Sequence, residues 1–400
     1  MAKKKIEEKT EKKVEVKTKK PVKKEEKNFS KQNVDFAKLN SKIQGAVNNV
    51  LNKKGLDSIE FLSDNIGVND YISTGNLAFN YAISGKIDGG YPVGRITELS
   101  GDPSAGKSFL STVAAINSLK KQYVTYFFDS EMAYDENFAK LIARVSGEDP
   151  SIVNLINYNN IDSIEETMSK IISIIDVFEK NKINSGATII VDGIAFLTTS
   201  KEKQDIDSGK EKVDMTKAKI LRQFLRVIKN RIKPLNICMI FTNQLTHNIG
   251  VSFGEKKVTT GGTAVPFASS VRTEISSKKI LADKKLEYTF QGLTFNIRTK
   301  KTRLTTPYKK ATFSFYIDGQ IEKIGNLVDL LFYNRVFDKE KNSYIFDDVR
   351  FTKKNFEEVI LKNPEQLKKL KERIAEYEKE PPKINVQETI EEPTEGMLEE

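Results

Sequence analysis

The chain has 400 residues, with 65 Lys and Arg against 55 Asp and Glu, and a net charge of +10. Its single Cys excludes a disulfide framework and a multi-cysteine zinc site, and its single His leaves little basis for a Ser-His-Asp triad. No apolar run approaches the roughly 18 residues that span a membrane, and the Lys-rich beginning lacks the apolar segment of a secretory signal. We expect a soluble, cytoplasmic protein without a membrane partner, whose basic balance suggests a polyanionic one.

The charge is segregated along the chain. Residues 1–28 hold 12 Lys and 6 Glu, whereas residues 380–400 hold 7 Glu and one Lys. These ends cancel, so residues 29–379 carry the whole +10, and residues 278–310 supply a net +8 of it. Both ends lack a core-forming pattern, which predicts a disordered basic tail and a disordered acidic tail.

A short amphipathic helix is predicted within residues 29–69, ahead of the main pattern. Its apolar positions recur at helical spacing, and Gly55 can end it. These positions are Phe36, Leu39, Ile43, Val47 and Val50. Periodicity alone leaves open whether the apolar face packs locally or docks on a neighbouring subunit.

Residues 70–325 alternate between short β-branched runs and helical stretches. Strands are predicted at 96–99, 123–128, 188–191 and 237–242, and helices at 107–119 and 164–178. This alternation predicts an α/β fold with a mostly parallel central sheet. Residues 326–379 form a separate small α+β pattern, with a hairpin around residues 344–346 and a charged helix after Pro364.

A phosphate-binding loop is predicted between the first of these strands and the helix that follows. Residues 101–108 fit the pattern G-x-x-x-x-G-K-[ST] without a mismatch. In such a loop the backbone amides cradle phosphates, Lys107 reaches the β- and γ-phosphates, and the Ser108 hydroxyl ligates Mg²⁺. The predicted nucleotide-binding residues are Gly101, Asp102, Pro103, Ser104, Ala105, Gly106, Lys107, Ser108 and Phe109.

Polar side chains follow the other predicted strands. Asp192 ends an apolar strand, and the carboxyl ends of parallel strands share one edge of a sheet, so it is expected to face Lys107 and to hold Mg²⁺. Glu131 is the best-placed group to activate water for hydrolysis, although Asp129 or Ser130 beside it could cap a helix. Gln244 could contact the γ-phosphate and report its presence to the residues that follow.

Those following residues resemble a functional loop. Glycines, threonines and isolated apolar residues occupy about 20 positions, which is long for an ordinary connection. Ile249 and Phe253 could wedge between bases, and the amides of Gly261 and Gly262 could bind phosphates. The pattern equally fits an active-site lid.

A second candidate loop runs from Asp205 to Thr216 and leads into a helix that carries three cations. These are Lys219, Arg222 and Arg226. Runs of charge are usually solvated faces, so this pattern alone gives DNA contact as the less favoured alternative.

Taken together, the motifs resemble those of bacterial RecA recombinases and of phage recombinases of the UvsX type. The resemblance covers about residues 34–378, with all motifs in the same order. They are Ile72-Ser-Thr-Gly75, Gly94-Arg95-Ile96, the phosphate loop, Phe128-Asp-Ser-Glu131, Val191-Asp192, Asn243-Gln244, Ile249-Gly250-Val251, Thr260-Gly261-Gly262, Ser270-Val-Arg272, Leu327-Val-Asp-Leu330 and Asn363-Pro364-Glu365.

This resemblance implies a DNA-dependent ATPase that forms helical filaments on single-stranded DNA and exchanges strands with a homologous duplex, using ATP and Mg²⁺. It assigns Glu131 to water activation and Gln244 to coupling. It makes the two loops DNA-binding segments, with Ile249 between base triplets, and the early helix a docking arm. Single-strand-binding or mediator proteins would be further partners, in a bacterial cell or in the host cytoplasm of a phage.

The resemblance implies further residue roles. Asp135 and Phe138 match positions that lie against adenine, with Phe138 replacing the usual tyrosine. Lys301 and Arg303 match cations that a neighbouring subunit lends to the γ-phosphate, and Arg303 replaces a lysine. The first loop is richer in Lys than the family pattern, and the basic tail has no counterpart in it.

Two other classes of function remain as alternatives. A ring-forming DNA helicase with the same core would unwind forked duplexes, but the loop at 249–263 argues against it. A non-catalytic mediator would bind ATP and load another recombinase, but the joint presence of Lys107, Glu131, Asp192 and Gln244 disfavours it. ATPase measurements with and without single-stranded DNA would separate the three.

Overall fold

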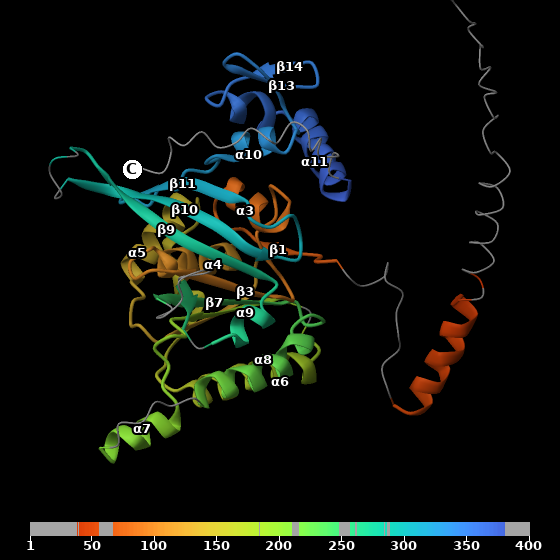
Figure 1. Cartoon of the computed structure of the whole chain (residues 1–400), viewed down its shortest axis with the longest axis vertical. Helices are drawn as coiled ribbons and strands as arrows, with labels where there is room; N and C mark the ends of the chain where they lie inside the picture. The colour runs from red at the N-terminus through yellow and green to blue at the C-terminus, as the bar shows by residue number, and fades with distance from the viewer. Residues whose placement is uncertain are drawn as a thin grey trace, which may run out of the picture. The chain divides into compact units, whose positions relative to one another are not determined.

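The computed structural model describes residues 38, 40–55, 67–183, 185–209, 216–247, 257–260, 262–283, 285 and 289–380 (Figure 1). The chain divides into two units, Met1–Gly67 and Val68–Glu400. The division of the second unit into the predicted core and C-terminal domain, at residue 325, stays a prediction.

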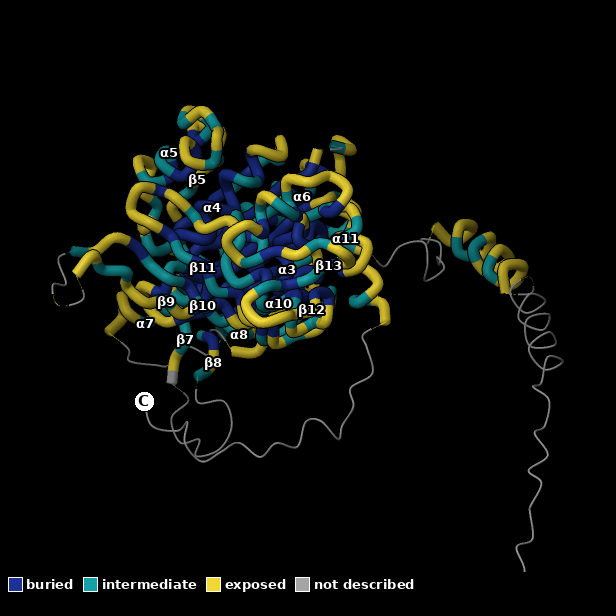
Figure 2. Tube along the Cα trace, turned by 90° about the horizontal axis from the view of Figure 1, so that it is seen from above, coloured by how far each residue is buried: buried dark blue, intermediate teal, exposed yellow. Residues whose placement is uncertain are grey.

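The first unit contains the predicted amphipathic helix, whose described part comprises residue 38 and residues 40–53. The chain turns at Gly55, whose φ is 69° and whose amide donates to the Asn52 carbonyl at 3.0 Å. Ile43, Val47 and Val50 are 54%, 39% and 52% exposed, and Figure 2 shows this helix without a buried residue. Its apolar stripe is therefore open. Phe36 and Leu39 lie outside the described residues.

A nine-stranded sheet forms the centre of the second unit. Its strands, in spatial order, are β11 (Lys310–Tyr316), β10 (Phe290–Thr302), β9 (Val271–Leu281), β3 (Ile96–Gly101), β7 (Ile237–His247), β6 (Ala187–Asp192), β4 (Val124–Asp129) and β5 (Ile156–Asn160), with β8 (Lys257–Thr259) beside β7. The strands from β9 to β5 run parallel, and β10, β11 and β8 pair antiparallel. This confirms the predicted α/β fold with a mostly parallel sheet, including all four predicted strands.

Helices cover both faces of the sheet (Figure 1). They are α3 (Leu77–Ser84), α4 (Lys107–Lys120), α5 (Glu136–Val145), α6 (Ile164–Lys180), α8 (Thr216–Arg231) and α9 (Ala264–Ala268), with the 3₁₀ turn Pro150–Leu155 before β5. The helix α7 (Ser200–Asp207) has no buried residue and projects away from the sheet (Figure 1). Along β6, Ile189 and Val191 pack in the cluster that contains α6 and α8, while Ile190 packs in the cluster that contains α4. Successive side chains of a strand point to opposite faces, so a continuous apolar run is buried on both sides.

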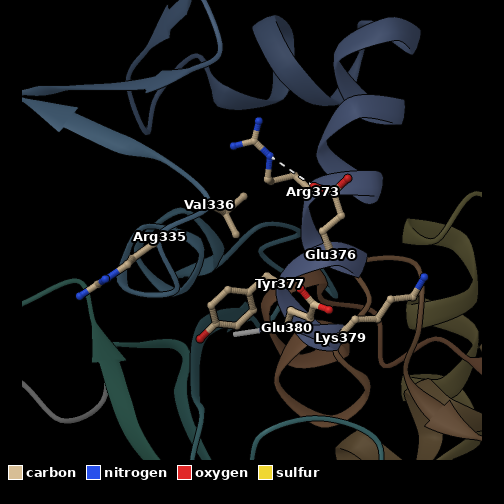
Figure 3. A pocket seen from close by; sticks show the side chains of 7 residues that line it. All are labelled: Arg335, Val336, Arg373, Glu376, Tyr377, Lys379 and Glu380. Carbon is tan, nitrogen blue, oxygen red and sulfur yellow. Dashed lines mark ion pairs between the residues drawn. The ribbon is translucent and has the colours of Figure 1, made fainter. Parts of the chain in front are cut away.

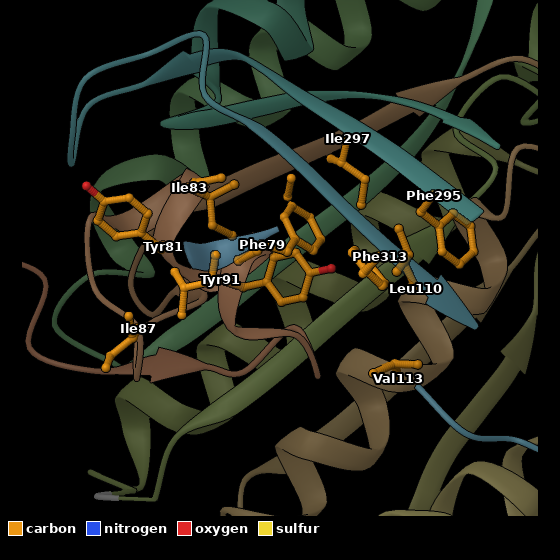
Figure 4. Close-up of a cluster of buried hydrophobic side chains, with 14 of the residues drawn as sticks. Phe79, Tyr81, Ile83, Ile87, Tyr91, Leu110, Val113, Phe295, Ile297 and Phe313 are labelled. Carbon is orange, nitrogen blue, oxygen red and sulfur yellow. The ribbon is translucent and has the colours of Figure 1, made fainter. Parts of the chain in front are cut away.

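Aromatic side chains fix the antiparallel end of the sheet to the helix α3 (Figure 4). Phe79 packs edge-on against Tyr91 of the short strand β2 (Tyr91–Pro92), at 5.9 Å between ring centroids, and stacks on Phe313 at 6.3 Å. The strand β2 pairs with β1 (Tyr71–Ile72). Because each ring is almost fully buried, this cluster holds β10 and β11 rigidly beside the parallel strands.

The last part of the described chain forms a small α+β layer. It contains α10 (Leu327–Tyr333), β12 (Asp338–Glu340), β13 (Ser343–Phe346), β14 (Val349–Phe351), a π-helical turn (Glu357–Leu361) and α11 (Pro364–Lys379). The predicted hairpin is in fact a three-stranded sheet. Lys309 at the base of β11 pairs with Glu378 of α11 at 2.6 Å, with both side chains largely buried, which ties this layer to the core.

A cavity of about 480 Å³ lies along α11 (Figure 3). Val336 and Tyr377 form its apolar wall, while Arg373 and Glu376 form an ion pair at 3.9 Å on its rim. The remaining lining residues are Arg335, Lys379 and Glu380. Charges of both signs surround this cavity, so it has no clear preference for an anion or a cation.

Candidate nucleotide-binding site

The phosphate loop connects β3 to α4, as the sequence predicts. Two glycines allow the tight path, because a Cβ on Gly101 would lie 2.6 Å from the Ile275 carbonyl oxygen and one on Gly106 would lie 2.3 Å from Phe295. Gly106 also has a φ of 94°, and no side chain caps the helix that follows it. The first amides of α4 are therefore available to an anion.

Lys107 lies inside the loop and is only 5% exposed. Its Nζ donates to the carbonyls of Gly101 at 3.2 Å and Asp102 at 2.9 Å. Burial lowers its pKa, and the charges of Glu131, Asp192 and Asp102 oppose that effect. The loop thus holds a cation among carboxylates, at the position where the sequence predicts phosphates.

Asp129 shapes the turn that presents Glu131. It ends β4 directly beside Asp192 of β6, and it is fully buried. Its carboxylate accepts from the amides of Glu131 and Tyr134, both at 3.0 Å, and from the Tyr158 hydroxyl at 3.2 Å. Asp129 does not cap a helix: the N-cap of the next helix, α5, is Asp135.

Asp192 lies at the predicted place, at the carboxyl end of β6, and is 1% exposed. Its Oδ1 accepts from the Thr242 hydroxyl at 2.6 Å, and the same hydroxyl oxygen accepts from the Gly193 amide at 2.6 Å. Its Oδ2 is buried without a hydrogen-bond partner. Burial raises the pKa of Asp192 to about 6, while the hydrogen bond from Thr242 and the nearby Ser108 hydroxyl lower it.

These residues fit a bound Mg²⁺. Asp192 presents an unpartnered buried oxygen, and the hydroxyl of Ser108 is its neighbour. Mg²⁺ takes hard oxygen ligands and is commonly held by one or two protein groups together with water and substrate phosphates. The described residues contain no cluster of three or more potential His, Cys, Asp or Glu ligands.

Thr242 is expected to set the pH at which this site can hold a cation. Because the pKa of Asp192 in the fold, about 6, exceeds the ordinary 3.8, the free energy of unfolding of the metal-free protein falls as pH rises through this window. A cation requires the ionised form, so Mg²⁺-dependent nucleotide binding should weaken as pH falls through about 6. Thr242→Val removes a hydrogen bond to the carboxylate and should move this midpoint to higher pH.

The shift of this midpoint is checked by measuring nucleotide binding with and without Mg²⁺ between pH 5 and pH 8, a range that brackets the Asp192 pKa of about 6. Thr246→Val is the matched control, since Thr246 lies on the same strand and its hydroxyl donates to the Val258 carbonyl at 3.3 Å instead. An identical midpoint for wild type and Thr242→Val would contradict the role of this hydroxyl.

Glu131 faces the same space. Its Oε1 is buried without a partner, and burial raises the pKa of Glu131, while the charge of Lys107 and the side chain of Gln244 lower it. Gly193 makes room for it: a Cβ there would lie 2.5 Å from the Glu131 Cγ, and the φ of Gly193 is 91°. Sequence reasoning missed Gly193 and Thr242, although a glycine directly after the strand-terminal Asp192 was an available signal.

Gln244 connects this site to the predicted loop after β7. It lies beside Gly101 in the sheet register, and its backbone carbonyl accepts from the Thr260 amide at 3.1 Å. The strand β7 continues past Gln244 to His247 and pairs with β8, so part of the predicted loop is a β-hairpin. We call the paired residues Leu245–His247 and Lys257–Thr259 the β7–β8 hairpin.

The predicted DNA loop is shorter than expected, because residues at both of its ends belong to the β7–β8 hairpin. Gly262 is described, with a φ of 74°, and α9 follows it. Four predicted DNA contacts, together with Gly261, lie outside the described residues. The four are Ile249, Gly250, Val251 and Phe253.

The predicted adenine contacts flank the start of α5. The carboxylate of Asp135 accepts from the Phe138 amide at 3.0 Å, which accounts for it as a helix cap. The Phe138 ring packs against Phe109 and Phe315, each at 5.6 Å between centroids. Phe109 of α4 is thereby placed in the same aromatic group. The role of Asp135 and Phe138 toward adenine stays a prediction.

Lys301 and Arg303 are not part of the site of their own chain. Lys301 lies opposite Arg272 on β9, which lies beside Glu98 on β3, three residues before Gly101. At about 3.3 Å per residue, three residues place Lys301 about 10 Å from Gly101 along the strands, toward the opposite edge of the sheet. The Lys301 Nζ donates to the Pro266 carbonyl at 2.9 Å.

The helix α8 presents the predicted cations to solvent. Lys219, Arg222 and Arg226 are exposed, while the opposite face packs into the core. No Asp or Glu occurs within α8. The preceding loop is shorter than predicted, because Asp205 belongs to the helix α7, and residues 210–215 lie outside the described residues.

The fold and the site define a protein with a P-loop of the strand–loop–helix type on a parallel sheet. The family model described as RecA N-terminal domain matches residues 41–322. The protein RecA of Chlamydia muridarum is 30% identical over 309 residues, which cover 76% of this chain and 81% of that protein. The protein RecA of Clostridium botulinum (strain Eklund 17B) is 30% identical over 349 residues, 86% of this chain and 91% of its own length. The chain belongs to the RecA family.

The membership confirms the predicted resemblance to RecA recombinases. In the part of the chain that the structure describes, no helix is long and apolar enough to cross a bilayer.

Proposed function

We propose that this protein is an ATP-dependent homologous recombinase. It polymerises as a helical filament on single-stranded DNA, pairs that strand with homologous duplex and hydrolyses ATP. The observation that supports this most directly is the convergence of Lys107, Glu131, Asp192 and Gln244 at one edge of the sheet. A mediator that only binds nucleotide has no need for a buried, unpartnered carboxylate oxygen at Glu131.

The residues divide the chemistry of hydrolysis among them. The loop amides and Lys107 bind the phosphates of ATP, and the carboxylate of Glu131 orients the attacking water and accepts its proton. The raised pKa of Glu131 makes it a better base than an exposed carboxylate. Ser108 and Asp192 would hold Mg²⁺, which neutralises charge on the phosphates when bound. Gln244 contacts Glu131 from the strand that leads into the hairpin.

Self-association uses surfaces that the single chain leaves open. The helix of residues 40–53 exposes an apolar stripe, and β5 is an edge strand of the described sheet. Lys301 lies beside Phe267, an aromatic residue that is 72% exposed. We infer that Lys301 and Arg303 reach the ATP of a neighbouring subunit, because they lie away from their own phosphate loop.

The partners follow from this function. They are single-stranded and double-stranded DNA, other copies of the chain, and single-strand-binding or mediator proteins, in the cytoplasm of a bacterium or of the host of a phage. ATPase assays with and without single-stranded DNA, together with electron microscopy, test the proposal. DNA-stimulated hydrolysis with helical filaments is the expected result; closed rings would favour a helicase, and absent hydrolysis a mediator.

The exposed cations of α8 are expected to contact the phosphates of single-stranded DNA. Replacing Arg222 and Arg226 together by Gln should weaken binding at low salt and reduce the slope of log K against log salt by about 1.4, since each phosphate contact contributes about 0.7. The matched control replaces Lys180 and Lys182, two exposed cations at and after the end of α6. A salt slope equal to that of wild type would show that Arg222 and Arg226 of α8 do not contact DNA phosphates.

The acidic tail at 380–400 is expected to compete with DNA for basic surface. Deleting residues 381–400 removes six Glu and one Lys and should strengthen duplex binding, most at low ionic strength. A salt titration of duplex affinity checks this. If the two curves coincide at every salt concentration, the tail does not screen the DNA site.

A further inference from the structure

The phosphate loop makes an ion pair with the β7–β8 hairpin. The Nζ of Lys257, the first residue of β8, lies 2.6 and 2.9 Å from the two carboxylate oxygens of Asp102, the second residue of the loop. Both side chains are partly exposed, Lys257 at 36% and Asp102 at 53%. The pair therefore lies at the surface, where either residue can be replaced without opening the core.

This pair is a second connection, separate from Gln244. Gln244 lies on β7 and acts on Glu131, whereas Lys257 lies on the returning strand and acts on the loop itself. Residues 257 and 247 are directly paired in the hairpin register. Both arms of the hairpin are thereby fastened to the nucleotide site, each to a different part of it.

The charges give the second connection a direction. Asp102 is a carboxylate in a loop that takes up a polyanion, and its charge already acts on Lys107 inside the loop. A triphosphate on the loop amides adds negative charge next to Asp102. The carboxylate of Asp102 and the triphosphate repel each other, and both attract the Lys257 ammonium. ATP should therefore strengthen the hold of the loop on β8.

We propose that Lys257 is a positioning residue that couples nucleotide binding to the hairpin through Asp102. This inference rests on the proposed function, since the hairpin carries the predicted DNA loop. By linkage, if the triphosphate favours the docked hairpin, the docked hairpin favours the triphosphate to the same extent. The free energy of an exposed ion pair corresponds to a change in affinity of about two- to fivefold.

The first test needs no DNA. Affinity for a non-hydrolysable ATP analogue is measured for wild type, Lys257→Gln, Asp102→Asn and the double variant. Lys257→Gln should weaken binding about two- to fivefold in the wild-type background and less in a chain that already carries Asp102→Asn, and Lys257→Arg should preserve it. Strictly additive effects in this cycle would overturn the proposal, whatever the protein does with DNA.

The second test measures single-stranded DNA affinity with and without the ATP analogue. Lys257→Gln removes a cation and Asp102→Asn an anion, so their nonspecific effects on DNA affinity have opposite signs. Both should nevertheless shrink the ratio of the two affinities, by about two- to fivefold, and salt should reduce that ratio in wild type. Lys120→Gln is the control, since Lys120 pairs with Glu148 at 3.2 Å at the far end of α4.

The outcomes separate the two proposals. If wild type binds no single-stranded DNA, the proposed function fails, and the nucleotide cycle alone decides whether Lys257 acts on the loop. If wild type binds DNA in an ATP-dependent manner and both variants keep the wild-type ratio, the coupling role of Lys257 is wrong and the recombinase proposal stands.

Discussion

Glu131→Gln should bind ATP and single-stranded DNA like wild type and hydrolyse ATP about 10²- to 10⁴-fold more slowly, the usual contribution of a positioned general base. The amide keeps the size of the side chain and its contact with Gln244, but it cannot accept a proton from water. The buried Oε1 has no partner in the protein, so nothing else competes for the water that it would orient. Single-turnover hydrolysis at saturating ATP measures this effect without a contribution from binding.

The control for this variant is Glu136→Gln. Glu136 is an exposed residue of α5 that pairs with Lys140 at 2.5 Å, five positions from Glu131. It should hydrolyse ATP at the wild-type rate. Wild-type hydrolysis by Glu131→Gln would transfer the base function to another residue, and loss of nucleotide binding would mean that Glu131 supports the loop rather than the reaction.

Replacing Lys301 and Arg303 together by Gln should lower DNA-stimulated hydrolysis about 10³-fold, as removal of cations that act across a subunit boundary does in other ATPases and GTPases. Folding of the single chain should change little, because the Lys301 ammonium donates only to backbone carbonyls at the surface. Hydrolysis with and without DNA, and thermal unfolding, measure the two effects separately.

A mixing experiment tests whether these cations act in trans. A Lys107→Ala chain has intact cations and no functional loop, and the Lys301 and Arg303 variant has the reverse. In filaments assembled from equal amounts of the two chains, about one quarter of the sites combine an intact loop with intact cations, so activity should return. Lys300→Gln is the control, since Lys300 pairs with Glu274 of its own chain at 3.0 Å. Mixtures that remain inactive at every ratio would place the cations in cis.

Much of the fold and part of the site could be predicted from the sequence, because those features depend on local patterns. The strand that ends at Asp192 is a continuous run of apolar residues, which is typical of a strand buried on both faces of a sheet. The loop before Lys107 fits a sequence motif of fixed spacing. The carboxyl-end rule for parallel strands then brings Asp192, Glu131 and Gln244 to one edge.

The contacts that tune the site lie between residues that are far apart in the sequence, and no local pattern encodes them. Thr242 is 50 positions from Asp192, and Lys257 is 155 positions from Asp102. The polar residues of α7 predict a loop over its last part, yet Thr199 and Glu202 form a capping box that starts a helix there. Local capping outweighs the absence of an apolar stripe in this segment.

The close approach of Gly106 to Phe295 has a genetic consequence. The ring that supports the phosphate loop belongs to β10, and the same strand carries Lys301 six residues later. In the proposed filament each copy of β10 therefore stands between two nucleotides, one bound to its own subunit and one to its neighbour. A chain with a disruptive mutation in β10 would inactivate two nucleotide sites in a mixed filament, its own and its neighbour's. Such an allele should therefore be dominant over the wild type when both are expressed in one cell.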